Sequence, residues 1–406
     1  MSPHALATLA SQHVWSCLLT PSRHWRHNTF GHVSSRPRDT GVTTRLVMSP
    51  HALATLASQH VRSCLLTPSR HWRHNTGQEF FHQNYYALFV SKLSGLLTIL
   101  VIPSILRVLV LTKQSGEPLT AFKRYLSTLS HMLDWYEGEL MHSDSRASQS
   151  LLSVHSRHCA ATHKAQKAGL GPISQLDMSL TQFGFMGYGL LYPRKLGLAG
   201  NEDDFEGFIH FWRTIGHVLG IEERFNICRE SVLETRILCQ RLVDEVFVAG
   251  LTAPPPQFAE MARSLLDGTW AMVPFIDHDA FLHFTKQLVG LRGELPDKAS
   301  ATTNVIHQFV VVSGATTCRM LTFHLVSSVN TSSIVENHSH DVNSVSVMYS
   351  GVLLALQVFV HEVLLATPII SVLVRFFLNI LMWFSIYMAQ RLPVLAYITW
   401  GPANVR

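Results

Sequence analysis

The chain has 406 residues, of which 47% are apolar and only 15% are charged, well below the roughly 25% of charged residues in an average soluble domain. Its formal charge of +5 is uneven, because residues 1–76 carry a net charge of +7 and the rest of the chain a net charge of −2. The main body therefore does not have the charge of a nucleic-acid-binding domain. Its low charge indicates a protein that meets a membrane or encloses a large apolar ligand.

The first 76 residues contain a near-perfect duplication, since Met1–Thr29 and Met48–Thr76 differ only at Trp15 and Arg62. Structural repeats normally diverge between copies and stack a shared apolar face. An unchanged copy that is rich in arginine does neither, so we expect a disordered extension over residues 1–77. The same composition is typical of a mitochondrial transit segment, which stays open as an alternative location.

The residues between 93 and 111 form an apolar run that is interrupted by Pro103 and Arg107. A proline and an arginine near the middle make a membrane span costly. The run therefore predicts two buried helices that meet at a kink at Pro103 and line an apolar pocket.

The next two segments carry the polar residues that most resemble a catalytic or metal-binding site. Arg124, Ser127 and Thr128 stand at i, i+3 and i+4, so a helix presents them on one face. Thirty residues after Thr128 comes His158, whose neutral imidazole is chemically suited to bind iron. From spacing alone, a histidine on a partly solvated helix face is the favoured interpretation.

Two further helices follow a firm break at Gly169–Pro172. Ser174 is placed to cap the first of them, with Asp177 three residues later, and Gln182 lies along it. On the second helix Arg213 shares a face with His210 and His217. An arginine there can neutralise a carboxylate of a cofactor or belong to a solvated stripe.

Six cysteines, at positions 17, 64, 159, 228, 239 and 318, show neither a C-x-x-C motif nor regular spacing. This pattern predicts reduced thiols rather than a zinc site or a disulfide framework.

The C-terminal quarter of the sequence has two parts that differ in periodicity and composition. Residues 296–347 lose periodicity and read as an irregular insertion, and residues 348–406 are strongly apolar. Pro368 separates two helix-length stretches, and the second carries Arg375 and Asn379 four residues apart. A polar stripe with an arginine favours a helix that lies in a membrane interface over one that spans the bilayer.

Four motifs in order resemble one family. Arg124-x-x-x-Thr128, the turn around Arg157-His158, and the segments Gln175–Phe185 and Phe208–Ile221 are similar to the catalytic domain of rubber oxygenases (latex-clearing proteins) and ER-bound mpaB oxygenases. The resemblance covers residues 78–295. It implies a mainly α fold with a single helical haem-binding domain, haem b, and dioxygen attack on carbon–carbon double bonds of isoprenoid chains.

By their positions in these motifs, the resemblance implies that His158 is the iron ligand. It also implies that Arg124 and Thr128 are catalytic residues on the other side of the haem. It also makes Arg157, Gln182 and Arg213 candidates for cofactor binding. Ser127 departs from the pattern, because some rubber oxygenases carry a lysine ligand there and serine has no comparable nitrogen. This departure argues against rubber itself as the substrate.

The sequence therefore predicts a haem-b-dependent oxygenase that oxidises or cleaves a C=C bond of an apolar isoprenoid or lipid. The expected partners are dioxygen, that substrate and a membrane, with the endoplasmic reticulum as the expected location. The alternative is a membrane-associated family member that binds haem or lipid without turnover.

Overall fold

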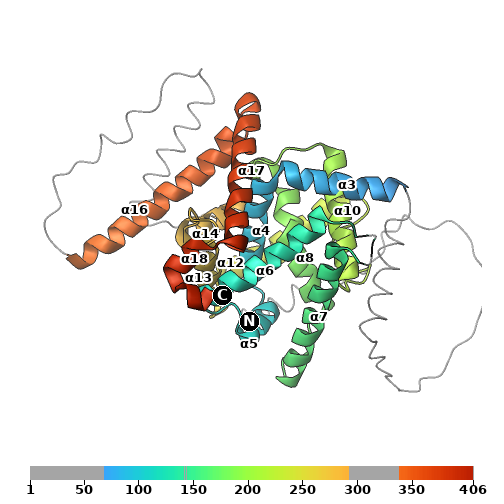
Figure 1. Cartoon of the computed structure of the whole chain (residues 1–406), viewed down its shortest axis with the longest axis horizontal. Coiled ribbons are helices and arrows are strands. Elements are labelled where there is room, and N and C mark those ends of the chain that lie inside the picture. The colour runs from blue at the N-terminus through green and yellow to red at the C-terminus, as the bar shows by residue number, and fades with distance from the viewer. Residues whose placement is uncertain (1–67, 141, 143, 292–337, 406) are drawn as a thin grey trace, which may run out of the picture.

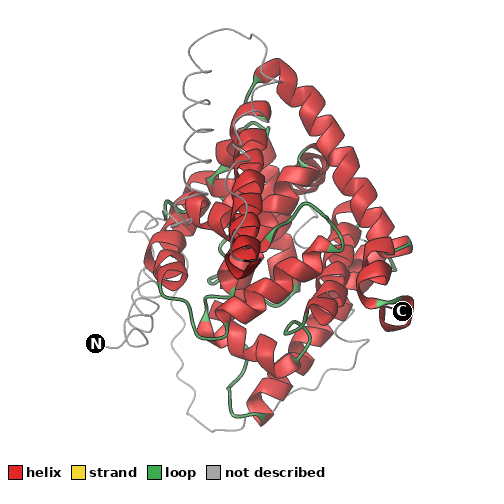
Figure 2. Ribbon diagram, turned by 90° about the vertical axis from the view of Figure 1, so that its left-hand side faces the viewer, coloured by secondary structure: helices red, strands yellow, loops and turns green. Residues whose placement is uncertain are grey.

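The computed structural model describes residues 68–140, 142, 144–291 and 338–405, and in these ranges all regular structure is helical (Figure 2). The main body contains α3 Pro68–Gln83, α4 Tyr85–Ile99, α5 Pro103–Thr112, α6 Pro118–Glu137, α7 Arg146–Lys167, α8 Gln175–Leu191, α9 Pro193–Leu196, α10 Glu202–Val218, α11 Val232–Leu242, the π-helix η1 Val243–Phe247, α12 Val248–Thr252, α13 Phe258–Trp270 and α14 His278–Leu288. The C-terminal part contains α16 His338–Phe359, the π-helix η2 Val360–Leu364, α17 Pro368–Arg391, α18 Val394–Trp400 and α19 Pro402–Val405. The mainly α prediction is confirmed. The disorder expected over residues 1–67 lies outside the described residues, as does the part of the expected irregular insertion up to residue 337. The last ten residues of that insertion, 338–347, are instead helical, because they form the start of α16.

Local signals in the sequence set the helix ends. Ser174 Oγ accepts a hydrogen bond from the Asp177 amide at 3.1 Å, and Asp177 Oδ2 accepts one from the Ser174 amide at 2.9 Å, which closes the predicted capping pair. Pro103 begins α5, and the axes of α4 and α5 differ by 95°. The predicted kink is therefore a sharp corner. Helix α4 is almost entirely buried, as predicted, but the prediction of a buried helix is wrong for α5, of which only Ile105 and Leu106 are buried.

The helical body begins before the expected boundary at residue 77. Helix α3 starts at Pro68 and packs along α10 (Figure 1). Gly77 allows the close approach, because a Cβ atom there would lie 2.4 Å from the Gly207 carbonyl oxygen. One turn earlier, His74 is buried and stacks on Phe211 with ring centroids 5.2 Å apart. The last ten residues of the predicted extension are therefore part of the packed body.

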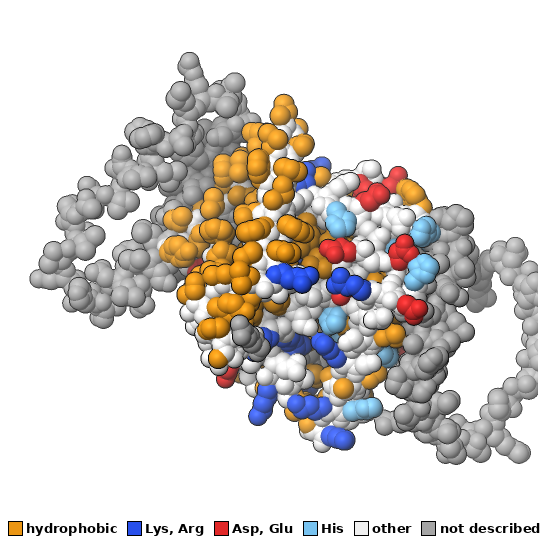
Figure 3. All heavy atoms as spheres, in the orientation of Figure 1, with side chains coloured by type: hydrophobic (Ala, Val, Ile, Leu, Met, Phe, Trp, Pro, Cys, Tyr) orange, Lys and Arg blue, Asp and Glu red, His pale blue; other side chains and the backbone are white. Residues whose placement is uncertain are grey.

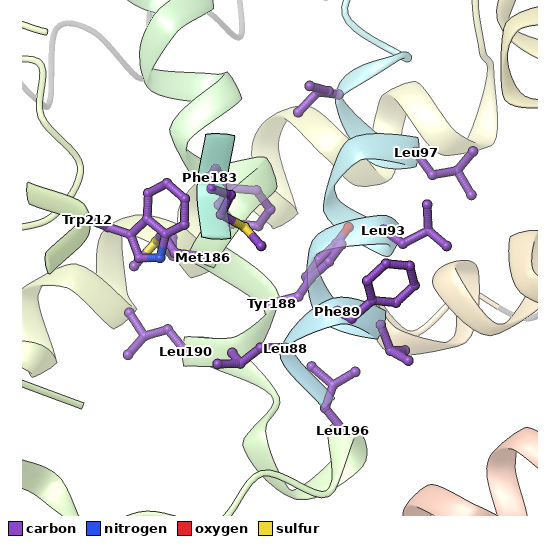
Figure 4. Close-up of a cluster of buried hydrophobic side chains, with 14 of the residues drawn as sticks. Leu88, Phe89, Leu93, Leu97, Phe183, Met186, Tyr188, Leu190, Leu196 and Trp212 are labelled. Atoms are coloured by element: carbon purple, nitrogen blue, oxygen red, sulfur yellow. The ribbon is translucent and has the colours of Figure 1, made fainter. Parts of the chain in front are cut away.

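The centre of the body is the crossing of α4 and α8. Gly95 and Gly184 meet there, and a Cβ atom on Gly95 would come within 2.0 Å of the Gly184 carbonyl oxygen. Around this contact, large apolar side chains of both helices fill the core (Figure 4); they include Leu88, Phe89, Leu93 and Leu97 from α4 and Phe183, Met186, Tyr188 and Leu190 from α8. Close packing of this kind fixes the relative positions of the two helices.

A stack of three aromatic rings connects α3, α6 and α10. Tyr136 lies between Phe81 and Phe211, with ring centroids 3.8 and 4.0 Å away and the planes nearly parallel. Because α6 and α10 carry several of the candidate site residues, this stack holds the walls of the site in place.

The C-terminal helices pack on this body, with α17 against α4 and α16 against α14 (Figure 1). The predicted break at Pro368 is confirmed as the start of α17. On η2, His361 is fully buried, donates a hydrogen bond from Nδ1 to the Leu196 carbonyl at 2.9 Å and stacks on Tyr86.

Candidate active site

A cavity of about 320 Å³ lies among α5, α6, α7, α8 and α10, beside the C-terminal end of α4. Figure 1 shows α5, α6, α7 and α8 on the same side of the body. Most of the lining is apolar and includes Leu96, Ile99, Ile105, Val154, Phe185 and Trp212. The volume falls in the range of small-molecule pockets, roughly 300–1,000 Å³. The predicted α4–α5 pair does line an apolar pocket.

One face of α6 forms the polar wall of the cavity. Arg124, Ser127 and Thr128 all line it, as their spacing predicts. The helix starts at Pro118, whose fixed φ suits a first helical position. The Thr128 hydroxyl donates to the Arg124 carbonyl at 3.1 Å, so its oxygen remains available as an acceptor. For Thr128 to donate to a ligand, this intrahelical bond has to break.

His158 comes to the cavity from α7, whose N-terminus is capped by Ser145. Its Nδ1 atom is buried without a hydrogen-bond partner among the described residues. Burial, together with the nearby His155 and Arg124, lowers the pKa of His158 to about 4. The imidazole is therefore neutral at physiological pH, which is the form that binds a metal ion.

Two arginines lie at the same cavity without an acidic partner. Arg157 donates to Ser127 Oγ at 3.3 Å and Arg124 donates to Thr112 Oγ1 at 3.4 Å. Neither forms an ion pair with a carboxylate among the described residues. Both hydrogen bonds are long and go to neutral hydroxyls, so the two guanidinium groups are free to pair with carboxylates of a ligand.

Gln182 and Asp177 also line the cavity from α8, but their polar atoms already have partners. Gln182 Nε2 donates to the Trp212 carbonyl at 2.9 Å and to Asn226 Oδ1 at 3.0 Å, and its Oε1 accepts from the Ile227 amide. The Asp177 carboxylate accepts hydrogen bonds from Ser104 and Ser174. These two side chains therefore hold the wall of the site together.

Arg213 is the one candidate that the structure keeps away from the cavity. Its guanidinium pairs with Glu223 and, at 3.5 Å, with Glu230, in a separate acidic hollow. Both acids belong to the segment after α10, which folds back over this face of the helix. Arg213 thus already has two carboxylate partners of its own chain.

His131 is a cavity residue that the sequence reasoning missed. It stands one turn after Ser127 on the same face of α6, and this spacing was the available signal. Its Nδ1 lies 2.7 Å from Ser150 Oγ, which also accepts a hydrogen bond from Trp135 Nε1 at 3.0 Å. A ring oriented in this way through Nδ1 leaves Nε2 for contact with a ligand.

This donor set fits haem b. Among the described residues, no three His, Cys, Asp or Glu side chains come together as the ligands of a bare metal ion. Haem iron needs only one or two protein ligands, since the porphyrin supplies four nitrogens. The unpartnered nitrogen of His158 suits the iron, the two acid-free arginines suit the two propionates, and the apolar lining suits the macrocycle.

The sequence matches the family model described as ER-bound oxygenase mpaB/B′/rubber oxygenase, catalytic domain, over residues 79–306. No curated protein and no solved structure matches the chain. The match covers more than half of the 406 residues and includes every residue of the cavity lining. The chain belongs to the ER-bound oxygenase mpaB/B′ and rubber oxygenase catalytic-domain family.

Proposed function

We propose that this oxygenase domain uses haem b to oxidise or cleave a C=C bond of an apolar isoprenoid or lipid. Family membership gives the coarse activity, so dioxygen and an organic substrate are its reactants. The observation that supports haem most directly is the buried, unpartnered Nδ1 of His158 beside two arginines that have no acidic partner.

Each polar group then has a role that its contacts permit. His158 would hold the iron, and Arg157 and Arg124 would bind the propionates. For Arg124 this role replaces the catalytic one that the resemblance implies. Haem b, when bound, supplies the dioxygen chemistry. Thr128 and His131 offer an acceptor oxygen and an oriented ring nitrogen along the same wall. The apolar lining binds the substrate chain and excludes water from the reacting atoms.

Replacement of His158 tests the cofactor. We expect the full-length protein, titrated with haemin, to develop a Soret band, and His158→Ala to lose it because the iron has no ligand. His163→Ala is the matched control, since His163 is an exposed histidine of the same helix outside the cavity lining. A His158→Ala protein with wild-type haem occupancy would contradict the assignment.

Binding without turnover is the second candidate function. It is favoured by Ser127, where a lysine ligand is absent and the hydroxyl instead accepts from Arg157. Incubation of the haem-loaded protein with unsaturated lipids and dioxygen separates the two functions. Oxygenated products support the oxygenase, whereas haem uptake without products supports the binding protein.

Membrane association is part of the proposal, with the endoplasmic reticulum as the membrane. Among the described residues, α17 is the one helix long and apolar enough to cross a bilayer by itself. An apolar substrate would be available to the cavity from such a surface. The mitochondrial alternative depends on residues 1–67, which lie outside the described residues.

A further inference from the structure

Helix α17 exposes a continuous apolar face that no other described element covers. Its members are large apolar side chains that are each between 45% and 84% exposed: Ile369, Ile370, Val372, Leu373, Phe376, Phe377, Ile380, Leu381, Trp383, Phe384 and Tyr387. At 3.6 residues per turn these positions cover about half of the helix circumference. Figure 3 shows an orange, apolar surface over α17 that continues onto neighbouring helices. Leu356 of α16 and Ile398 of α18 are also exposed, at 54% and 77%.

The opposite face of α17 is hydrogen-bonded to the body. Arg375 donates to the Gly197 carbonyl at 3.0 Å. Asn379 donates to the Gln83 carbonyl at 2.8 Å and accepts from the Tyr86 amide at 3.0 Å. Near the helix end, Gln390 donates to Ser130 Oγ at 2.9 Å. Arg375, Asn379 and Gln390 thus bind the body, and the apolar face is left for another partner.

We infer that α17 lies in the plane of a membrane surface and inserts its apolar face into one leaflet, without crossing the bilayer. A spanning orientation would remove Arg375 and Asn379 from these partners and place them in hydrocarbon, where unsatisfied polar groups are strongly disfavoured. In-plane insertion keeps every one of these hydrogen bonds. It is the arrangement expected of a helix that is apolar on one half and polar on the other.

The charges around this face favour lipid over a second copy of the chain. Residues 363–406 contain no acidic residue and three arginines, at positions 375, 391 and 406. Exposed Arg391 ends α17, and the exposed Lys123 lies beside the last helix, where it donates to the Asn404 carbonyl. Anionic headgroups can pair with the exposed Arg391 and Lys123, whereas Arg375 is bound to the body. A second copy would bring the same cations to the interface without acids to pair with them.

The inference rests on the membrane association proposed above, and vesicle flotation of the full-length protein tests both. The vesicles are phosphatidylcholine with and without phosphatidylserine. We expect the protein to float with vesicles, more so with phosphatidylserine, and Phe376→Gln with Phe377→Gln to weaken partitioning by about tenfold or more. Leu233→Gln with Ile237→Gln is the matched control, since these two residues of α11 are similarly exposed, at 65% and 54%.

Labelling of the two ends of α17 then separates in-plane insertion from spanning. The variants Ala366→Cys and Arg391→Cys, each at an exposed position, are treated with a membrane-impermeant maleimide added outside the vesicles. The parent protein, treated in the same way, gives the background. In-plane insertion predicts that both positions react. Reaction at one end only, with the other end reacting after detergent, would overturn the in-plane arrangement and leave membrane association intact. Failure of the wild-type protein to float would overturn both.

Discussion

Gln182 shows how a polar side chain on a cavity wall can serve the fold. Its three hydrogen bonds join α8 to the Trp212 backbone and to Asn226 and Ile227 after α10. Gln182→Leu removes the partner of the buried Ile227 amide and one hydrogen bond each from the Trp212 carbonyl and Asn226 Oδ1, at a cost on the order of 2–4 kcal/mol in the free energy of unfolding. We expect thermal unfolding without any ligand to show this loss, and the exposed Gln166→Leu to show little change.

The opposite result would give Gln182 a different role. If Gln182→Leu unfolds like the wild type but no longer retains haemin, the amide acts on the cofactor.

The partners that a side chain already has also distinguish Arg157 and Arg124 from Arg213. The first two have only hydroxyl partners at the cavity, whereas Arg213 is already neutralised by Glu223 and Glu230.

At the scale of whole helices, the α4–α8 crossing fixes the spacing of two helices that both line the cavity. Gly95 lies one residue before Leu96, which lines the cavity, and it faces Gly184 of α8. Gly95→Ala places a methyl group 2.0 Å from backbone, so the helices have to separate. We expect a loss of stability of about 1–3 kcal/mol, measured by denaturant unfolding, together with weaker haemin binding.

Gly116→Ala is the matched control for this substitution, because nothing lies within 4 Å of a Cβ atom at that position. Equal unfolding midpoints for Gly95→Ala and Gly116→Ala would show that the crossing tolerates a wider spacing than the structure has.

What the sequence could predict at this scale depends on how local the signal is. The capping pair of Ser174 and Asp177, the breaks at Pro103 and Pro368 and the shared face of Arg124 and Thr128 follow from spacing within one or two turns, and the structure has them all. The partners of Arg213 and Gln182 lie ten or more residues away, on a segment whose path depends on packing. The start of α3 likewise depends on contacts with α10, and nothing in the duplicated sequence indicates these contacts.

For the whole molecule, acid stability depends on imidazoles that folding keeps neutral. Burial lowers the pKa of His74 to about 3 and that of His361 to about 4, and His158 behaves similarly. In the unfolded chain these groups titrate near 6.5. Between pH 6.5 and 4 the unfolded state therefore binds more protons, so the free energy of unfolding falls as the pH falls through this window and levels off above it.

Between pH 6.5 and 5 we expect the free energy of unfolding to fall by about 2 kcal/mol for each fully buried imidazole. Denaturant unfolding at fixed ionic strength measures it. His74→Phe isolates one contribution, because both ring nitrogens of His74 lack hydrogen-bond partners among the described residues and the ring stacks on Phe211. The variant should have the stability of the wild type at pH 7.5, and its free energy of unfolding should fall less than that of the wild type between pH 7.5 and pH 5. An unchanged pH dependence would show that His74 titrates alike in the folded and the unfolded chain, in which case the acid sensitivity belongs to other buried histidines such as His361.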